Sequence, residues 1–374
     1  MNREAETPAA GFSHPRIRSI DALRGFDMFW IVGAGTLAAS LSEVSHTGFF
    51  RLLKEQLEHS AWEGFTFCDL IFPLFIFLAG VSVVFSIGRA LESGDRARAV
   101  RRIVRRSIVL FALGIFYYGG FAQPLEKIRL LGVLQRIALC YFAAAMLFTF
   151  FKPRVLAGIC LGLLVLYWAL MTFVPVPGVG AGCFDQGKNL ANYLDSRYLP
   201  LRKWDGTWDP EGLLSTLPAV STCLLGVFAG LFLTRRDLTE GRKALTFLGV
   251  GPVLVVLGFL WGLQFPVIKK IWTSSYVLVA GGYSLILLGL FHLIVEAWGY
   301  RKWCEPFVWI GMNSITIYMA DNLVDFLGIA RRFAGGDIQK ALGPAGKPVV
   351  AAVSLGLVFL LARFLYKRKI FIRA

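Results

Sequence analysis

The sequence predicts an all-α fold, a polytopic integral membrane bundle of about ten transmembrane helices with both the N-terminus and the C-terminus in the cytoplasm. Composition is the first reason, because 56% of the 374 residues are hydrophobic and 17% are charged, against roughly 25% charged residues in a soluble domain. Long charge-free runs and an uneven distribution of basic residues are the second and third reasons. This composition argues against a soluble enzyme and excludes an intrinsically disordered chain, which requires low hydrophobicity.

Five runs in the N-terminal half are expected to cross the membrane, because a helix needs about 20 apolar residues to span the hydrocarbon core. Three of them contain no charged residue: 70–88, 107–125 and 155–184. Two others carry polar intrusions: 23–41 and 130–151. The residues before the first run lack the apolar core and the small-residue cleavage site of a signal peptide. We therefore expect residues 1–15 to be a mobile cytoplasmic tail.

Five more spans in the C-terminal half are expected to complete a single transmembrane domain over residues 16–374. Three of these runs are free of charge: 212–234, 244–268 and 271–295. The last two contain polar or charged residues: 306–327 and 348–366. Two long loops are expected outside the cell, 42–66 and 175–211. Within the second loop, the run 189–199 predicts a short helix on the membrane surface.

Basic residues determine the expected orientation. With ten spans and a cytoplasmic N-terminus, 24 Lys and Arg residues fall on the cytoplasmic side and 14 on the other side, as the positive-inside rule requires. The membrane thus accounts for the net charge of +15, and we expect no nucleic-acid partner. The run RRIVRR at 101–106 is interpreted as a stop-transfer charge cluster, with a nucleic-acid or phosphate-binding patch as the alternative.

Several polar residues lie inside the expected spans, where a charge costs roughly 2.5–3.5 kcal/mol and needs a partner or a purpose. Asp21 and Arg24 are three residues apart, on one face of a helix, and are expected to pair. Asp27 lies one turn deeper in the same span. Arg136 is placed either to snorkel to the surface or to bind an anion, and Asn313 is placed to hydrogen-bond across helices.

The loop before the second span concentrates titratable residues at the membrane surface. His59, Glu63 and Asp69 lie within eleven residues. A histidine titrates near neutral pH, so it can act as a base or carry an acyl group, and a carboxylate can hold its imidazole in one tautomer. Glu63 is the local candidate for that contact, whereas Asp69 would need tertiary folding. The six cysteines form no C-x-x-C pair and predict neither a disulfide framework nor a metal site.

Six segments in chain order resemble one family, the heparan-α-glucosaminide N-acetyltransferases, within a wider group of transmembrane acyltransferases. They are SIDALRGFDMFW (19–30), HSAWEGFTFCDLIFP (59–73), GVLQRIA (132–138), WDPEGLLST (208–216), WTSSYV (272–277) and WIGMNS (309–314). One such motif would be weak, but six in order over about residues 16–330 are specific. The resemblance implies a bacterial relative in the cytoplasmic (inner) membrane and, by analogy with the family, a homodimer.

The resemblance also implies a reaction. Acetyl would pass from cytoplasmic acetyl-CoA to an amino sugar or glycan on the non-cytoplasmic side, by N- or O-acetylation and without a metal. The family's active histidine lies in the loop before the second span, which matches His59, and Asp69 would orient it. The residues that would contact acetyl-CoA are Arg24, Gln135, Arg136 and Asn313.

Four residues are matched to the acceptor on the same basis. Asp209 and Glu211 would hold its ammonium or hydroxyl groups, and Trp62 and Trp208 would offer flat faces for sugar stacking. Tryptophan at this depth is also typical of the aromatic belt at a membrane interface. The two interpretations of the tryptophan pair stay open on the sequence.

Two other classes of function stay open as well. A transporter or channel for a sugar or small metabolite would line its path with Asp27, Arg136 and Asp321, and it could dispense with His59. A membrane scaffold without chemistry would tolerate the loss of all four residues. An acyltransferase needs both His59 and a site for CoA, and this requirement separates the three classes.

Overall fold

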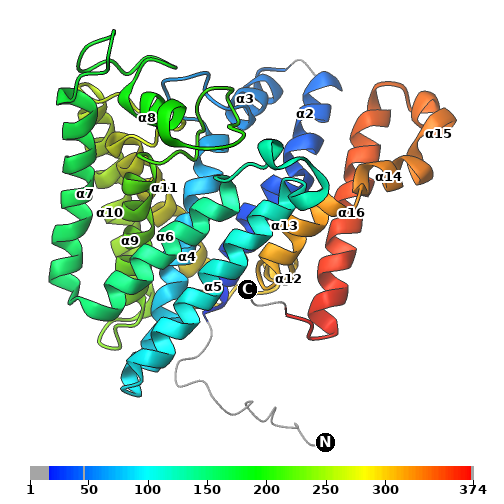
Figure 1. Cartoon of the computed structure of the whole chain (residues 1–374). Coiled ribbons are helices and arrows are strands. Elements are labelled where there is room, and N and C mark those ends of the chain that lie inside the picture. The colour runs from blue at the N-terminus through cyan, green and yellow to red at the C-terminus, as the bar shows by residue number, and fades with distance from the viewer. Residues whose placement is uncertain (1–16, 45–46, 372–374) are drawn as a thin grey trace, which may run out of the picture.

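The computed structural model describes residues 17–44 and 47–371, which fold into a bundle of helices (Figure 1). The first half contains α1 (Arg18–Phe29), α2 (Gly35–Val44), α3 (Gly48–Leu57), α4 (Phe67–Glu92), α5 (Arg96–Tyr117), α6 (Val133–Phe150), α7 (Pro153–Phe173) and α8 (Leu190–Tyr198). The second half contains α9 (Thr216–Leu233), α10 (Glu240–Gly262), α11 (Ser274–His292), α12 (Glu305–Gly311), α13 (Ser314–Leu323), α14 (Phe326–Ala334), α15 (Gly336–Ala341) and α16 (Gly346–Lys367). The expected all-α class is confirmed, and the tail expected at 1–15 lies outside the described residues.

Among the described residues, seven helices are long and apolar enough to cross a membrane, judged by length and composition. They are α4, α6, α7, α9, α10, α11 with its extension to Ala297, and α16. Each corresponds to one of the expected spans, so the chain is a multi-pass membrane protein. The other three expected spans correspond to α5 and to two interrupted helices, and their crossing of the membrane stays a prediction.

Loops that the charge distribution assigns to one side gather at one end of the bundle. In Figure 1, α3, α8, α14 and α15 lie at the upper end, whereas α5 begins and α16 ends at the lower end. Polar contacts at the upper end also join loops that are assigned to the same side, because Lys269 lies 3.0 Å from His59 and Lys270 lies 2.9 Å from Asp205. The loops before α4, α9 and α11 therefore meet. The assignment of this end to the outside stays a prediction.

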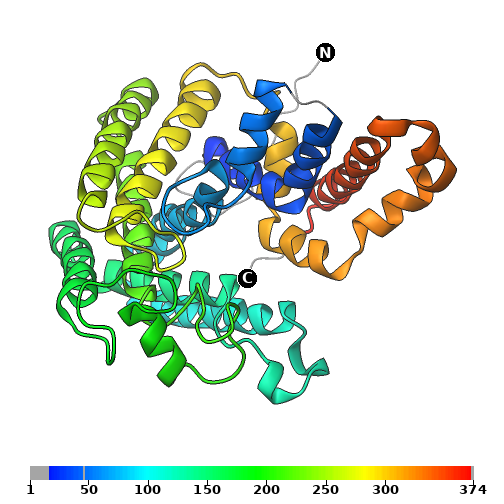
Figure 2. The same cartoon turned by 90° about the horizontal axis from the view of Figure 1, so that it is seen from above.

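Helices α4 and α9 form the centre of the bundle, and two thirds of each apolar segment is buried. Glycines let their backbones touch: a Cβ on Gly80 would lie 1.9 Å from the carbonyl oxygen of Cys223, and one on Gly226 would lie 1.9 Å from that of Phe77. Small residues at such crossings are typical of membrane helices. Helices α7 and α10 lie at one edge of the bundle and α14–α16 at the opposite edge (Figures 1 and 2).

Several boundaries of the expected spans are wrong, and two of them have a clear physical reason. Helix α5 begins at Arg96, so the arginine-rich run forms its first turns and not a loop. Arginine is a good helix former, and its long side chain can reach water from a helix. Helix α7 ends at Phe173, because Pro175 and Pro177 cannot continue it. The remainder of the expected span 155–184 belongs to the following loop.

Two other expected spans are interrupted helices. Helices α1 and α2 continue each other through a π-helical turn, Trp30–Ala34, in which Gly33 has a φ of 150°, a value that glycine adopts readily. Helices α12 and α13 are separated at Asn313, whose φ of −126° and ψ of 29° are not helical. The short helix expected at 189–199 is confirmed as α8, with the Asn189 side chain as its N-cap.

Candidate active site

A cavity of about 480 Å³ lies at the end of the bundle that carries α3 and α8. Its lining includes four residues that the sequence singled out: His59, Trp62, Asp69 and Glu211. They come from the loop before α4, from the first turn of α4 and from the loop before α9. Within the described part of the chain, no group of three or more His, Cys, Asp or Glu residues could hold a metal ion.

The imidazole of His59 is held by the carboxylate of Asp69, with 2.9 Å between Nδ1 and Oδ1. Asp69 is itself fixed by the start of α4, where it completes a capping box. Its Oδ2 accepts the backbone N–H of Thr66 at 3.2 Å and the side-chain hydroxyl of Ser60 at 2.9 Å. The structure therefore forms the contact between His59 and Asp69, which depends on tertiary folding. The local alternative, Glu63, is exposed, and its backbone pairs with Ile268.

Lys269 adds a positive charge to this pair. Its Nζ lies 3.3 Å from Oδ1 of Asp69 and 3.0 Å from Nδ1 of His59. The hydrogen bond to Asp69 raises the pKa of His59 to about 9, while the ammonium of Lys269 acts in the opposite direction. Burial lowers the pKa of Lys269, and the charge of Asp69 opposes this effect. The carboxylate of Asp69 thus contacts two basic groups, the imidazole of His59 and the amine of Lys269.

The other ring nitrogen of His59 faces a thiol. Nε2 lies 3.8 Å from Sγ of Cys68, a residue that also lines the cavity. The proton on Nδ1 is donated to Asp69, so Nε2 is the nitrogen that remains for chemistry in the cavity. The sequence analysis assigned no role to Cys68, which is one of six cysteines without a C-x-x-C pair.

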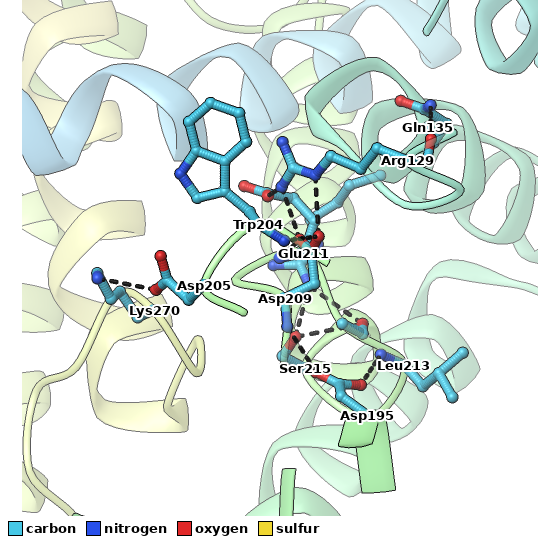
Figure 3. Close-up of polar contacts among 12 residues, drawn as sticks. Arg129, Gln135, Asp195, Trp204, Asp205, Asp209, Glu211, Leu213, Ser215 and Lys270 are labelled. Carbon is cyan, nitrogen blue, oxygen red and sulfur yellow. Dashed lines mark hydrogen bonds and ion pairs between the residues drawn. The ribbon is translucent and has the colours of Figure 1, made fainter. Parts of the chain in front are cut away.

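Asp209 and Glu211 meet on Arg129 (Figure 3), which the sequence did not single out. Arg129 donates from Nε to Oδ2 of Asp209 at 2.9 Å and from Nη2 to Oδ1 at 2.6 Å, a bidentate pair. Nη2 also donates to Glu211. The guanidinium lies over the rings of Tyr118 and Trp204, 4.7 and 4.8 Å from their centroids. Asp209 is buried behind Arg129, whereas Glu211 reaches the cavity.

One guanidinium therefore faces two carboxylates, of which only Glu211 lies on the cavity wall. Burial raises the pKa of Glu211, and the charge of Arg129 opposes this effect. Burial alone would lower the pKa of Arg129, but the hydrogen bond to Asp209 and the charge of Glu211 outweigh it and raise the pKa. The cluster has one more acidic than basic group, and both Arg129 and Glu211 line the cavity. The additional carboxyl group at the cavity wall is complementary to an ammonium ion.

The two tryptophans matched to the acceptor differ in position. Trp62 lines the cavity, and its Nε1 donates to the carbonyl of Phe184 at 3.0 Å. Trp208 is buried and packs edge-to-face against Trp62, with 5.8 Å between ring centroids. Trp204, which the sequence did not single out, lines the cavity instead. Trp62 and Trp204 both line the cavity, as do Trp30 and Trp272, and Arg129 covers one face of Trp204.

A second cavity of about 460 Å³ approaches from the opposite half of the bundle. Four arginines line it: Arg24, Arg102, Arg105 and Arg106. The expected pairing of Arg24 with Asp21 is present at 3.6 Å. Three apolar residues line both cavities and form a common wall: Phe75, Ile137 and Ile315. A cationic cavity and a histidine cavity thus lie back to back.

Three residues matched to acetyl-CoA line neither of these cavities. Arg136 is buried, donates to Ser215 Oγ and to the carbonyl of Gly212, and lies over the ring of Trp272. Gln135 is buried beside Arg129 and donates to its carbonyl at 3.4 Å. Asn313 is buried at the break between α12 and α13. Of the four, only Arg24 lies where a ligand could reach it.

Comparison with known proteins gives one family. The family model described as heparan-alpha-glucosaminide N-acetyltransferase, catalytic, matches residues 16–260, more than half of the chain. The mouse heparan-alpha-glucosaminide N-acetyltransferase is 28% identical over 377 residues, which are 84% of this chain and 56% of the mouse protein. The human protein of that name is 28% identical over 423 residues, 96% of this chain and 60% of its own length. The chain thus spans less than two thirds of either relative.

Proposed function

Because the chain belongs to the heparan-α-glucosaminide N-acetyltransferase catalytic family, we propose that it is a transmembrane acetyltransferase. It moves acetyl from cytoplasmic acetyl-CoA to an amino sugar or glycan on the other side of a bacterial cytoplasmic membrane. The observation that carries the proposal is the pair of cavities that share one apolar wall. The His59–Asp69 pair lies in one cavity and four arginines lie in the other.

The arginine cavity suits the nucleotide of CoA. Phosphates are anions, and guanidinium groups bind them with paired hydrogen bonds. The pantetheine arm is uncharged and thin, so it suits the apolar wall formed by Phe75, Ile137 and Ile315. With the phosphates on the arginines, the thioester would reach His59 past these three side chains. Their side chains must move for this passage, since they separate the two cavities.

The histidine cavity suits an amino sugar. His59, once neutral, accepts a proton through Nε2 when the acceptor's amine or hydroxyl attacks, and Asp69 holds its ring in place. The negative charge at Glu211 attracts an ammonium, and Trp62 and Trp204 offer faces for a sugar ring. Asp209 acts on the acceptor only through Arg129, which it holds.

The test is acetyl-CoA turnover by purified protein in nanodiscs. Glucosamine and a panel of amino-sugar glycosides serve as acceptors, and CoA release that depends on an acceptor supports the proposal. Folded protein that neither binds nor consumes acetyl-CoA would contradict it. Uptake of sugars into liposomes would then test the transporter, the alternative in which Asp27 and Asp321 line a path.

Replacing Arg105 by glutamine is expected to raise KM for acetyl-CoA by about tenfold, since one charge-assisted contact to a phosphate is worth roughly 1.4 kcal/mol or more. We expect kcat to change much less, because Arg105 lines the cavity far from His59. Arg101→Gln is the matched control, since Arg101 is exposed on the same helix and does not line the cavity. Equal KM values for the two variants would remove Arg105 from the CoA site.

The rate is expected to rise with pH until His59 loses its proton. Its pKa of about 9 keeps the imidazole protonated at neutral pH, and only the neutral form can act as a base. A profile of kcat/KM should therefore climb from pH 7 and level off above about 9. Lys269→Met removes the charge that opposes protonation, so the midpoint should move to higher pH. Lys270→Met, the same charge change at a residue paired with Asp205, should leave the midpoint in place.

A further inference from the structure

Cys68 completes an ordered series of three side chains in the histidine cavity. Its Sγ lies 3.8 Å from Nε2 of His59, and Nδ1 of the same ring lies 2.9 Å from Oδ1 of Asp69. A nucleophile, a base and a carboxylate that orients the base are the arrangement that activates thiols and hydroxyls in enzymes. The proposed function uses the histidine and the carboxylate and leaves the thiol unassigned.

The surroundings of Cys68 also fit a reacting thiol. It is half-buried and lines the cavity, and it lies in the first turn of α4, a helix of 26 residues. The N-terminus of a helix stabilises an anion. The other described cysteines lie elsewhere: four are buried, and Cys183 is half-buried in the loop before α8, outside the cavity. The thiol of Cys68 is therefore both accessible and beside a base.

We propose that Cys68 is the nucleophile that carries the acetyl group between acetyl-CoA and the acceptor, with His59 as its base. This inference rests on the proposed function. It makes the reaction a double displacement, in which CoA leaves before the acceptor reacts. Donor and acceptor then need not occupy the site together, which suits substrates that reach the site from opposite sides of a membrane.

In the first step, Nε2 of His59 removes the thiol proton of Cys68. The thiolate attacks the carbonyl carbon of acetyl-CoA, a new carbon–sulfur bond forms, and the bond to the CoA sulfur breaks. CoA leaves as a thiolate and takes the proton from the imidazolium. The enzyme then holds an S-acetyl group on Cys68 and a neutral His59. One thioester has replaced another, so the step is readily reversible.

In the second step, the amine of the acceptor attacks the carbonyl carbon of S-acetyl-Cys68. Nε2 of His59 takes a proton from the amine, and the carbon–sulfur bond breaks. The Cys68 thiolate regains that proton from the imidazolium. The products are the N-acetylated acceptor and the starting enzyme. A hydroxyl acceptor reacts in the same way and gives an ester.

The experiment uses the full chain in nanodiscs with acetyl-CoA and no acceptor. Intact-mass and peptide analysis should find one acetyl group on Cys68 that neutral hydroxylamine removes. Labelled CoA should exchange into acetyl-CoA, and Cys68→Ala and Cys68→Ser should lower this exchange by at least about 100-fold, the order expected for loss of a catalytic nucleophile. Cys183→Ala, which removes a half-buried thiol outside the cavity, should keep exchange within about twofold of wild type.

The outcomes separate this inference from the proposed function. Wild-type protein that acetylates an acceptor while Cys68 stays unmodified, or that carries the acetyl group on His59, overturns the role of Cys68 alone. The role of Cys68 is also overturned if the Cys68→Ala variant folds, binds acetyl-CoA and exchanges labelled CoA as fast as the wild type. Wild-type protein that neither binds acetyl-CoA nor acetylates any acceptor overturns the proposed function itself. The mass measurement on the wild-type protein still tests the role of Cys68 if a Cys68 variant fails to fold.

Discussion

Replacing His59 by alanine is expected to lower kcat for acetyl transfer by roughly 10²–10⁴-fold, the usual contribution of a positioned acid–base group. The side chain lies between the thiol of Cys68 and the carboxylate of Asp69, so its loss removes the base that the carboxylate orients. The ring is half-exposed and contributes little to the core. Acetyl-CoA binding should therefore survive, and the loss should appear in kcat and not in KM. Turnover and equilibrium binding, measured on the same preparation, check this.

Glu63→Gln is the matched control for His59→Ala. Glu63 lies four residues away in the same loop, but its side chain is exposed and does not line the cavity, so we expect a rate within about twofold of wild type, as for most surface changes. Asp69→Asn should be almost as damaging as His59→Ala, because an amide cannot stabilise the protonated imidazole. A fully active His59→Ala variant would contradict the role of His59 as the base and the role of Asp69 in orienting it.

The long apolar helices could be predicted because a run of some 20 apolar residues has few stable alternatives to a membrane span. The interruptions at Gly33 and Asn313 could not, since a break of one residue leaves the mean hydropathy of a run almost unchanged. The start of α5 could not be predicted for a different reason. Its arginines carry the charge that is typical of a loop, but arginine favours helices, and three of them, Arg102, Arg105 and Arg106, line a cavity.

Part of the site could also be predicted. His59 and Asp69 share one segment, and the pattern Thr66-x-x-Asp69 is a capping-box signal that places the carboxylate at a helix start. Arg129 and Lys269 could not be found in this way, because their partners lie 80 or more residues away in the chain. By sequence alone, each is a basic residue in a loop between two spans. Only the folded structure brings them to the carboxylates that they neutralise.

Replacing Arg129 by methionine is expected to destabilise the protein by on the order of 3–5 kcal/mol, the usual effect of removing one partner of a buried ion pair. The side chains of Arg129 and Asp209 are 5% and 0% exposed, so the two carboxylates would be left buried and close together without a cation. The thermal midpoint in detergent should fall, and activity should fall with it, because Glu211 forms part of the cavity wall. Thermal unfolding of the purified variant measures this effect.

A second change on the same background shows whether the uncompensated carboxylates cause the loss. Arg129→Met combined with Asp209→Asn removes one buried charge, so it should recover part of the stability that Arg129→Met loses. Arg197→Met is the matched control, since Arg197 is exposed on α8, and it should leave the thermal midpoint nearly unchanged. If the double variant is no more stable than Arg129→Met, the loss comes from the packing of Arg129 against Tyr118 and Trp204. The electrostatic explanation would then be wrong.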